Sequence, residues 1–521
     1  MTEMRKEDTI EITVNEAGFE YDIHSLIKAF YPAYNVKVSV CPDVREKEPD
    51  LSNADMAFQF TKEAVLLFLR KEESKAASFA TEKDSAEKED MVKEPETPPE
   101  RIVKLSADLS DEPPRPEVKN RIKRLIYDAL SRETGKQLPW GTLTGIRPVK
   151  ISMSLLEEGK AENEIMDYMK KTYLISDEKA DLAVRIAERE KAILETLHYE
   201  NGYSLYIGIP FCPTTCLYCS FTSYPLVSWK KRVGEYLNAL EKEIDYVAES
   251  HRGKVLDTVY IGGGTPTTLE PPQMKRLLDK IRGSLDLSHL KEFTVEAGRA
   301  DSITPEKLEV LRKGGVTRIS VNPQTMKQET LDLIGRRHTV EQVKEAFAMA
   351  RSAGFSNINM DIILGLPGEN AQDVRHTMEE ISKLNPDSLT VHSLAIKRAS
   401  KLSQWIVENG ISTLNNTEET MEITAQGAAL MGMVPYYLYR QKNMSGNFEN
   451  VGYAREGKFG IYNILIMEEK QNIVALGAGS ISKRLFPGGR IERCENVKEV
   501  AQYIERIDEM IERKCVLFRD L

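Results

Sequence analysis

From residue 200 onward, short apolar runs alternate with longer segments in which apolar residues recur at helical spacing. The short runs predict strands and the longer segments predict helices. This alternation is typical of parallel βα units, and six units predict a partial (β/α)6 barrel with right-handed crossovers. The predicted strands are Leu205–Ile209, Thr258–Ile261, Glu292–Val295, Thr317–Val321, Asn359–Leu364 and Ser388–Leu394. The predicted helices are Trp229–Ala248, Pro272–Ile281, Pro305–Lys313, Val340–Ala353 and Asn370–Leu384.

We place this α/β barrel at residues 200–400, and a smaller α/β module at residues 1–70. In the smaller module, Ile10–Val14 and Val36–Val40 alternate like half-buried strands. Between them, Tyr21–Phe30 has the pattern of a helix. The chain therefore predicts at least two α/β regions of different size.

The other regions have different patterns. Residues 71–119 hold 14 acidic residues, 9 basic residues and six prolines, which predicts a flexible acidic linker. Residues 120–199 predict a helical segment, with Gly135 placed to end its first helix. Residues 401–521 predict an α+β region that covers the substrate. Its predicted elements are an antiparallel strand pair and a final helix, at Phe459–Met467, Ile473–Ala478 and Val497–Lys514.

Composition narrows the class of protein. The chain of 521 residues is 41% hydrophobic and 29% charged, which excludes wholesale disorder, collagen and a disulfide scaffold. The net charge is 71 − 81 = −10, which argues against nucleic acid as a partner. No apolar run reaches the roughly 18–20 residues of a membrane span, and Met1–Glu7 lacks the apolar core of a signal peptide. We therefore expect a cytoplasmic monomer without a membrane span.

Three of the six cysteines lie within eight residues, directly after the first barrel strand. Cys212, Cys216 and Cys219 have the spacing C-x3-C-x2-C. Three thiolates this close can each hold one iron of a 4Fe–4S cluster and leave the fourth iron open. The alternative is a structural zinc site, whose fourth ligand would have to come from far along the chain, at Cys494 or Cys515.

This loop, with Tyr218 just before the last cysteine, resembles that of the radical S-adenosylmethionine (SAM) enzymes. The resemblance implies a partial TIM-type barrel, a 4Fe–4S cluster on the three cysteines, and SAM chelated by the open iron. It also implies reductive cleavage of SAM to a 5′-deoxyadenosyl radical. An exposed cluster of this kind is sensitive to oxygen.

Further motifs come in the order seen in the oxygen-independent coproporphyrinogen III oxidases. They are Ile209–Cys212, Gly262–Pro266, Asn322–Thr325 and Asp361–Pro367. Pro139–Pro148 and the N-terminal extension are similar to the longer branch, coproporphyrinogen dehydrogenase. The resemblance implies decarboxylation of two propionates to vinyl groups, which converts coproporphyrinogen III to protoporphyrinogen IX in haem biosynthesis. It also implies a small flavodoxin or ferredoxin as electron donor.

The resemblance further implies which residues bind SAM. They are Tyr206, Tyr218, Gly263, Gly264, Thr265, Glu296, Gln324, Arg336 and Asp361. Gln324, Arg336 and Asp361 would bind a second SAM molecule beside the first. A structural ion pair between Arg336 and Asp361 is the alternative, because a buried carboxylate needs a partner. The glycine run could be only a turn, and Glu296 only a surface acid.

Residues Tyr436–Asn443 interleave aromatic rings with cations, which suits a flat ligand with carboxylates. The proposed tetrapyrrole contacts are Tyr437, Tyr439, Arg440 and Lys442. The alternative is an ordinary strand with a mixed face. His392, in the sixth strand, is interpreted as a hydrogen-bonded core residue rather than a ligand, and Cys41, Cys494 and Cys515 as ordinary thiols. No residue is assigned as a catalytic acid or base.

Two departures from the best-studied family type affect the substrate. Ser220–Phe221 stands where that type has another cysteine close behind Cys219, and the N-terminal segment differs. Two other functions therefore stay open. One is a haem chaperone without oxidase activity, with His392 or a distal cysteine as axial ligand. The other is radical opening of the haem ring by methyl transfer, which yields a linear tetrapyrrole.

Overall fold

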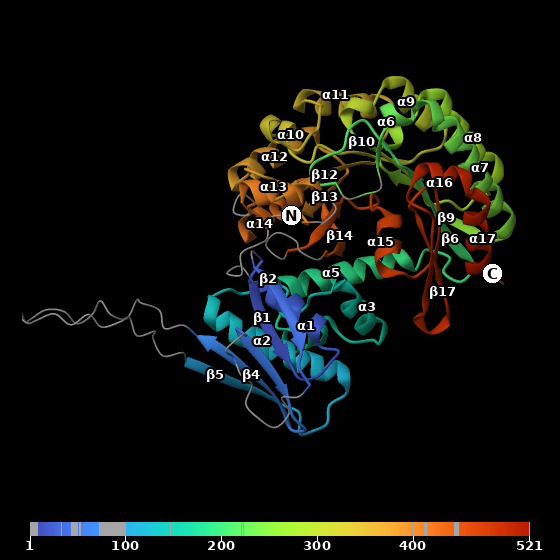
Figure 1. Ribbon diagram of the computed structural model, residues 1–521. Helices are drawn as coiled ribbons and strands as arrows, with labels where there is room; N and C mark the ends of the chain where they lie inside the picture. The colour runs from blue at the N-terminus through green and yellow to red at the C-terminus, as the bar shows by residue number, and fades with distance from the viewer. Residues whose placement is uncertain are drawn as a thin grey trace, which may run out of the picture. The chain divides into compact units, whose positions relative to one another are not determined.

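The computed structural model describes most of the chain. The described residues are 9–32, 34–42, 51, 54–71, 101–145, 147–219, 221, 223–396, 400–410, 414–441 and 448–519. They fall into two compact units. The first comprises Met1–Thr144 and Met166–Ala180, and the second comprises Gly145–Ile165 and Asp181–Leu521. In Figure 1 the strands of the first unit are blue and those of the second run from green to red.

The first unit is built on a five-stranded sheet with the order β2-β1-β3-β4-β5. Its elements are β1 (Thr9–Val14), α1 (Glu20–Phe30), β2 (Asn35–Val40), β3 (Met56–Phe60), β4 (Ala64–Lys71), β5 (Arg101–Asp108) and α2 (Arg115–Thr134). β1 and β2 are parallel with α1 between them, as the alternating pattern predicts, while β3, β4 and β5 form an antiparallel meander. α2 ends at Gly135, whose φ is +67°.

The predicted linker over 71–119 is wrong at its C-terminal end. β5 pairs with β4 along its whole length, from Lys71↔Arg101 to Ala64↔Asp108. α2 begins at Arg115 and buries an apolar face in the core of the unit. The linker was predicted from the acidic composition, although Val103, Leu105 and Ala107 alternate as in a strand. These three side chains pack on the core. Residues 72–100 lie outside the described part of the chain.

The second unit contains an eleven-stranded sheet, and its six central strands are parallel and consecutive in the chain. They are β6 (Gly202–Ile209), β9 (Val255–Gly263), β10 (Glu292–Gly298), β11 (Arg318–Val321), β12 (Ile358–Leu364) and β13 (Ser388–Ser393). The intervening helices are α7 (Val233–Ser250), α8 (Pro271–Ser284), α9 (Pro305–Lys313), α11 (Val340–Ser352) and α12 (Ala371–Leu384). They form an outer layer around an arc of strands (Figure 1). The predicted partial (β/α)6 barrel is confirmed.

Further strands extend the arc at both edges, and the barrel does not close. β15 (Asn450–Ala454) pairs with β13 and carries β14 (Val434–Tyr439) as the outermost strand. At the other edge, β16 (Asn472–Leu476) lies parallel to β6, followed by β17 (Ile481–Leu485) and β18 (Ile491–Glu495).

The predicted antiparallel pair in the C-terminal region is wrong. Ile461–Glu468 forms helix α15, and β16 pairs instead with β6. The run is apolar on nearly all sides, so periodicity cannot tell a buried helix from a buried strand. Helix formation is supported at the N-terminus, where the Glu292 carboxylate accepts hydrogen bonds from the amides of Ile461 and Tyr462, at 2.7 and 3.4 Å. α15 packs against β14 and β9.

The predicted final helix is interrupted at Arg506 and forms two shorter helices, α16 and α17. The remaining elements are α3 (Val149–Glu157), α4 (Glu162–Tyr173), α5 (Asp177–Leu194), β7 (Phe211–Cys212), β8 (Tyr224–Pro225), α6 (Leu226–Trp229), α10 (Gln328–Leu333), α13 (Lys401–Asn409), α14 (Glu418–Leu430), α16 (Val500–Glu505) and α17 (Ile507–Leu517). Among the described residues, no helix is both long and apolar enough to cross a membrane.

Candidate functional site

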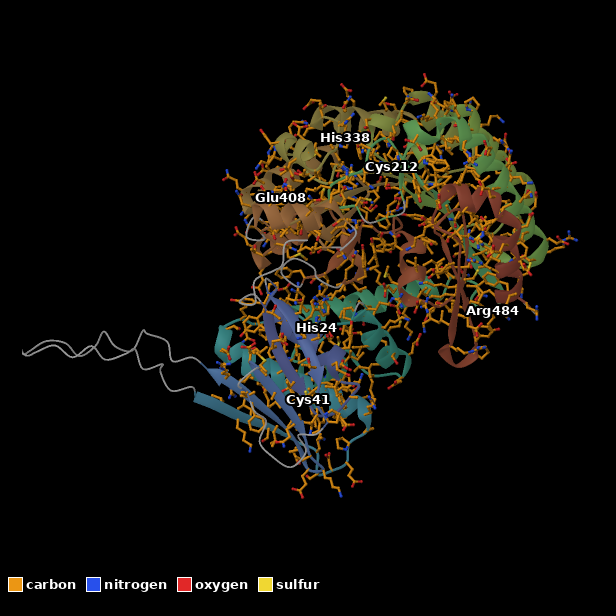
Figure 2. The ribbon with its side chains drawn as sticks, in the orientation of Figure 1. His24, Cys41, Cys212, His338, Glu408 and Arg484 are labelled. Carbon is orange, nitrogen blue, oxygen red and sulfur yellow. The ribbon has the colours of Figure 1, made fainter. Side chains whose placement is uncertain are left out.

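The three clustered cysteines follow the first barrel strand, as the motif predicts. Cys212 lies in β7, directly beyond the end of β6, and Cys216 and Cys219 follow in a turn. The turn is held by hydrogen bonds from the Cys219 amide to the Cys216 carbonyl, at 3.3 Å, and from the Leu217 amide to the Ile334 carbonyl, at 2.9 Å. Figure 2 shows Cys212 within the side chains of the second unit. All three thiols are unoxidised and at least half-buried.

The glycine run at the end of β9 lies directly against Cys212. The Gly264 amide donates to the Ile209 carbonyl at 2.8 Å, and the Thr265 amide donates to the Phe211 carbonyl at 2.7 Å. A Cβ at position 264 would lie 2.6 Å from the Phe211 carbonyl oxygen and 3.0 Å from Cys212 Sγ. Gly263, one residue earlier, has a φ of +107°. The run thus places backbone without a side chain beside a thiol, where a ligand could approach it closely.

The donor set of the cysteine loop fits a cluster better than a single metal ion. In the described part of the chain, no three His, Cys, Asp or Glu side chains are placed to hold one metal ion. A 4Fe–4S cluster takes one thiolate per iron, so its three sulfurs need not converge on one point. Burial, reinforced by the neighbouring thiols, raises the pKa of Cys212, and Thr265 Oγ1 donates to its sulfur at 3.5 Å.

Arg299 is a neighbour of the cysteines that the sequence did not indicate. Its guanidinium is buried, pairs with Asp301 at 3.0 and 2.7 Å, and donates to Thr214 Oγ1 at 2.6 Å. It also approaches Cys216 Sγ at 4.0 Å. A cation here stabilises thiolates. Its position directly after β10 could have indicated a functional role, because functional side chains gather at the carboxyl ends of barrel strands.

Glu296 lies near the end of β10 inside the barrel and is not a surface acid. Burial raises its pKa to about 7, although the Tyr260 hydroxyl donates a hydrogen bond to it. Tyr260 stacks on Tyr462 of α15 with ring centroids 4.5 Å apart, and Tyr206 stacks beside both at 6.1 Å. Three neighbouring tyrosines thus form an apolar wall beside a carboxyl group that is easily ionised near neutral pH.

Gln324 has an uncommon backbone conformation for a residue with a side chain. Its φ is +70°, and its amide and carbonyl bridge to Asp361 and Ile363 of β12, both at 2.9 Å. The side chain is buried, and among the described residues its Oε1 has no hydrogen-bond partner. Strain combined with an unsatisfied buried oxygen is typical of ligand sites.

Arg336 and Asp361 do not form the ion pair that was the structural alternative for them. Arg336 is buried and donates to the Tyr218 hydroxyl at 3.3 Å and to the Asn322 carbonyl at 2.5 Å. Asp361 instead accepts from Asn359 Nδ2 at 2.6 Å and lies 3.7 Å from His392 Nε2. Burial raises the pKa of Asp361, but the hydrogen bonds and charge around it outweigh burial, so the net pKa is lowered.

The aromatic strand β14 faces the same interior. Tyr437 and Tyr439 stack with centroids 6.3 Å apart and an interplanar angle of 12°, and the Tyr439 hydroxyl lies 3.3 Å from His392 Nδ1. Both ring nitrogens of His392 thus face protein groups, as its interpretation as a core residue predicts. Arg440 is buried, and burial lowers its pKa to about 10. Lys442 lies outside the described residues.

The other three cysteines belong to other elements than this loop. Cys41 follows β2 in the first unit and is half-buried, and its amide donates to the Val14 carbonyl at 2.8 Å. Cys494 is buried in β18, and Cys515 is exposed on α17. They are free thiols.

Comparison with known proteins finds one matching family model and several similar proteins. The family model of the radical SAM superfamily matches residues 206–381. The oxygen-independent coproporphyrinogen-III oxidase-like protein HemZ of Bacillus subtilis is 42% identical over 416 residues, covering 79% of this chain and 83% of HemZ. The heme chaperone HemW of Bacillus subtilis is 34% identical over 308 residues, covering 59% and 76%. The solved coproporphyrinogen III oxidase (HemN) of Escherichia coli is 24% identical, with a TM-score of 0.48, covering 62% and 73%.

Proposed function

Because the chain belongs to the radical SAM superfamily, in the family of oxygen-independent coproporphyrinogen-III oxidase-like proteins, we propose that it is an oxygen-independent coproporphyrinogen III dehydrogenase. It decarboxylates two propionates of the porphyrinogen to vinyl groups and yields protoporphyrinogen IX. The observation that carries this proposal is the barrel interior, where Glu296 of β10, Asp361 of β12, His392 of β13 and Tyr439 of β14 lie close enough to interact.

Membership of the superfamily implies a 4Fe–4S cluster and SAM, and this chain has residues that fit both. Cys212, Cys216 and Cys219 would hold the cluster. When bound, the cluster supplies the single low-potential electron that cleaves SAM and starts radical chemistry. The protein's part is to bind and orient SAM and substrate and to keep water from the reacting carbon.

Within this proposal, each SAM residue has a task that its surroundings support. The bare backbone at Gly263 and Gly264 lets the amino acid part of SAM approach the cysteine loop. The ionised Glu296 carboxylate accepts hydrogen bonds from both ribose hydroxyls, as acids do in nucleotide folds. Tyr206 and Tyr218 would flank the same molecule, and Thr265 would line it.

A second SAM molecule is assigned to Gln324, Arg336 and Asp361. The Gln324 Oε1, which has no partner among the described residues, is a ready acceptor for a ligand amine. The pKa of Asp361 is lowered, which favours its ionised form. The carboxylate would attract the positive charge of SAM.

For the substrate, the stacked rings of Tyr437 and Tyr439 would pack on the tetrapyrrole face. Arg440 and Lys442 are the proposed partners of its carboxylates. Arg440 is buried, and the nearby acid Glu449 opposes the lowering of its pKa. A propionate that binds Arg440 would therefore lie close to the Glu449 carboxylate. A small flavodoxin or ferredoxin would supply the electron.

An anaerobic turnover with reconstituted protein, SAM, a low-potential reductant and coproporphyrinogen III tests the proposal. Loss of two carboxyl groups, matched by 5′-deoxyadenosine and followed by mass spectrometry, would support it. Deoxyadenosine formed without change in the porphyrinogen would contradict it. A linear tetrapyrrole formed from added haem would instead establish ring opening.

The haem chaperone is the second candidate, because chaperone relatives match up to 59% of this chain at 28–37% identity. In this chain, both ring nitrogens of His392 face protein groups, which disfavours it as an axial haem ligand. A haem titration decides between the two functions. Stoichiometric binding with a Soret shift that is lost in His392→Ala would favour the chaperone.

A further inference from the structure

The segment after Cys219 is exposed although it is tied directly to the cysteine strand. β8 (Tyr224–Pro225) pairs with β7, in the register Phe211↔Tyr224 and Cys212↔Pro225. The Tyr224 amide also donates to the Pro210 carbonyl at 2.8 Å. Neighbouring strands lie about 5 Å apart, so Pro225 is held beside the residue that begins the cysteine motif.

Beyond β8 the chain turns outward through α6 and a short 3-10 helix. Tyr224 packs edge-on against Trp229 at 5.7 Å, and the Arg232 guanidinium lies over the Trp229 ring at 5.6 Å. Lys231 is six residues after Pro225, which is about 10 Å of helical rise. The segment is therefore an ordered projection close to the cysteines.

Two bulky apolar side chains of this projection face solvent. Phe221 is 75% exposed and Val227 is 85% exposed. Isolated apolar residues on a surface are common, but these two lie six residues apart, on either side of a strand that is anchored to Cys212. They offer apolar contact area on the segment that pairs with the strand of Cys212.

The charge of this stretch differs from that of the whole chain. From Asn201 to Gly234 there is no Asp or Glu, although the chain carries 81 acids and a net charge of −10. Lys230 and Lys231 are exposed, and neither is in an ion pair in the described part of the chain. The adjacent Arg232 pairs with Glu235 at 2.9 Å. The projection is thus a basic site on an acidic protein.

We infer that Phe221, Val227, Lys230 and Lys231 form the docking surface for a small acidic electron-carrier protein of the flavin or iron–sulfur class. The carrier's acidic surface complements the two lysines, and its apolar contact area covers the two exposed side chains. One electron leaves the reduced carrier for the cofactor held by the cysteines, and the carrier departs oxidised by one electron. This inference rests on the proposed function, since only radical SAM chemistry needs that electron.

The test compares Lys230→Glu/Lys231→Glu with Lys160→Glu/Lys291→Glu. Both lysines of the control pair are also exposed, and their substitution changes the net charge equally. Lys291 directly precedes β10 and thus lies at the opposite end of that strand from Glu296. The probe is oxidised flavodoxin, whose binding is followed by flavin fluorescence anisotropy. We expect the first variant to weaken the Kd at least about tenfold and the control to leave it unchanged. In wild type, binding should weaken steeply as salt rises from 0.05 to 0.3 M.

Turnover separates this inference from the proposed function. SAM cleavage driven by dithionite, which needs no docking, should be equal in wild type and in both variants. Cleavage driven by reduced flavodoxin should require at least about tenfold more carrier in the first variant only. Val227→Ser, which keeps both charges, should weaken binding with a smaller change in salt dependence.

Four results would overturn the inference. Equal flavodoxin binding by wild type and the lysine variant, with dithionite-driven cleavage intact, would reject the docking surface alone. A wild-type dimer that dissociates on the same substitutions would assign the surface to a second copy of the chain. Absence of dithionite-driven SAM cleavage in wild type would reject the proposed function, and the inference with it. If the lysine variant does not fold, salt-independent binding by wild type would still reject it.

Discussion

A methyl group added at Gly264 should disturb the backbone next to the cysteine loop. An added Cβ meets the Phe211 backbone oxygen at 2.6 Å, which cannot rotate away, and the Cys212 sulfur at 3.0 Å. Overpacking of this kind costs about 1–3 kcal/mol and moves the backbone that carries the contact. The residue's importance therefore follows from the space around it.

We expect Gly264→Ala to lower the iron bound after anaerobic reconstitution and to destabilise the protein by about 1–3 kcal/mol. Gly283→Ala is the matched control, because Gly283 lies in α8 and a Cβ there meets nothing within 4 Å. Iron content and urea unfolding measure the two effects. Full iron loading of Gly264→Ala would show that the strand can shift without disturbing the cysteines.

Glu296 should make SAM binding depend on pH. Burial raises its pKa to about 7, and only the ionised carboxylate can accept from both ribose hydroxyls. If binding requires that form, the Kd for SAM falls about tenfold between pH 6 and pH 8. Isothermal titration calorimetry at both pH values tests this. Glu296→Gln should bind weakly with no such dependence, and an unchanged slope in that variant would assign it to another group.

Among the elements, helix α17 is tied to helix α7 by a buried ion pair between Lys514 and Glu243. Lys514 Nζ donates to Glu243 Oε1 and to Asn496 Oδ1, both at 2.6 Å. Glu243 Oε2 in turn accepts from the Gly477 amide at 2.8 Å. The helix therefore holds the turn after β16, and a Cβ at Gly477 would lie 2.4 Å from the Gly208 carbonyl oxygen of β6.

Removing the cation from this pair should be costly. Lys514→Met leaves Glu243 buried without its charge partner, which costs about 3–5 kcal/mol. The comparison is Lys242→Met, whose pair with Asp508 is exposed and contributes at most about 1 kcal/mol. Urea unfolding of both variants measures the difference. Equal stability of the two variants would mean that Asn496 and Tyr503 compensate fully for the lost lysine.

Elements with a single clear period could be predicted from the sequence. β12 and β13 were found because apolar runs bounded by turns have few alternatives, and Asp361 stood out within such a run. α15 was missed because its apolar residues face every direction, and its helical form depends on a carboxylate 169 residues away, at Glu292. The roles of Arg299 and β8 were missed for a similar reason, because their contacts arise only through tertiary pairing.

For the whole molecule, the buried acid Glu190 should make the free energy of unfolding depend on pH around and above neutrality. Glu190 on α5 is fully buried, and neither carboxylate oxygen has a hydrogen-bond partner in the described part of the chain. Burial, together with the charge of Glu468, raises its pKa well above the usual range. The folded state thus binds this proton more tightly than the unfolded chain does. Stability is therefore lost as pH rises above the unfolded-state pKa of about 4.5 toward the folded-state pKa.

We expect the free energy of unfolding to fall between pH 6.5 and pH 8, by up to about 1.4 kcal/mol per pH unit for this proton. The buried His251 and His338, whose pKa burial lowers to about 4, act in the opposite direction only below about pH 6.5. Urea unfolding at three pH values in this window measures the slope. Glu296 and Glu468, whose pKa values burial raises to about 7, lower the stability in the same direction, mainly below about pH 7.5. Glu190→Gln should therefore reduce the slope most in the upper part of the window, and an unchanged slope in that variant would contradict the assignment.

The open arc of strands also bears on how the protein behaves when concentrated. A sheet that does not close has two terminal strands whose backbone could template growth by another chain. Pro435 in β14 has no amide hydrogen to offer, and Arg189 occupies its carbonyl. β18 carries exposed charges at Glu492, Arg493 and Glu495, and α17 packs against it. Both ends of the sheet are thus protected, so amyloid-like stacking through this sheet should be slow even in concentrated preparations.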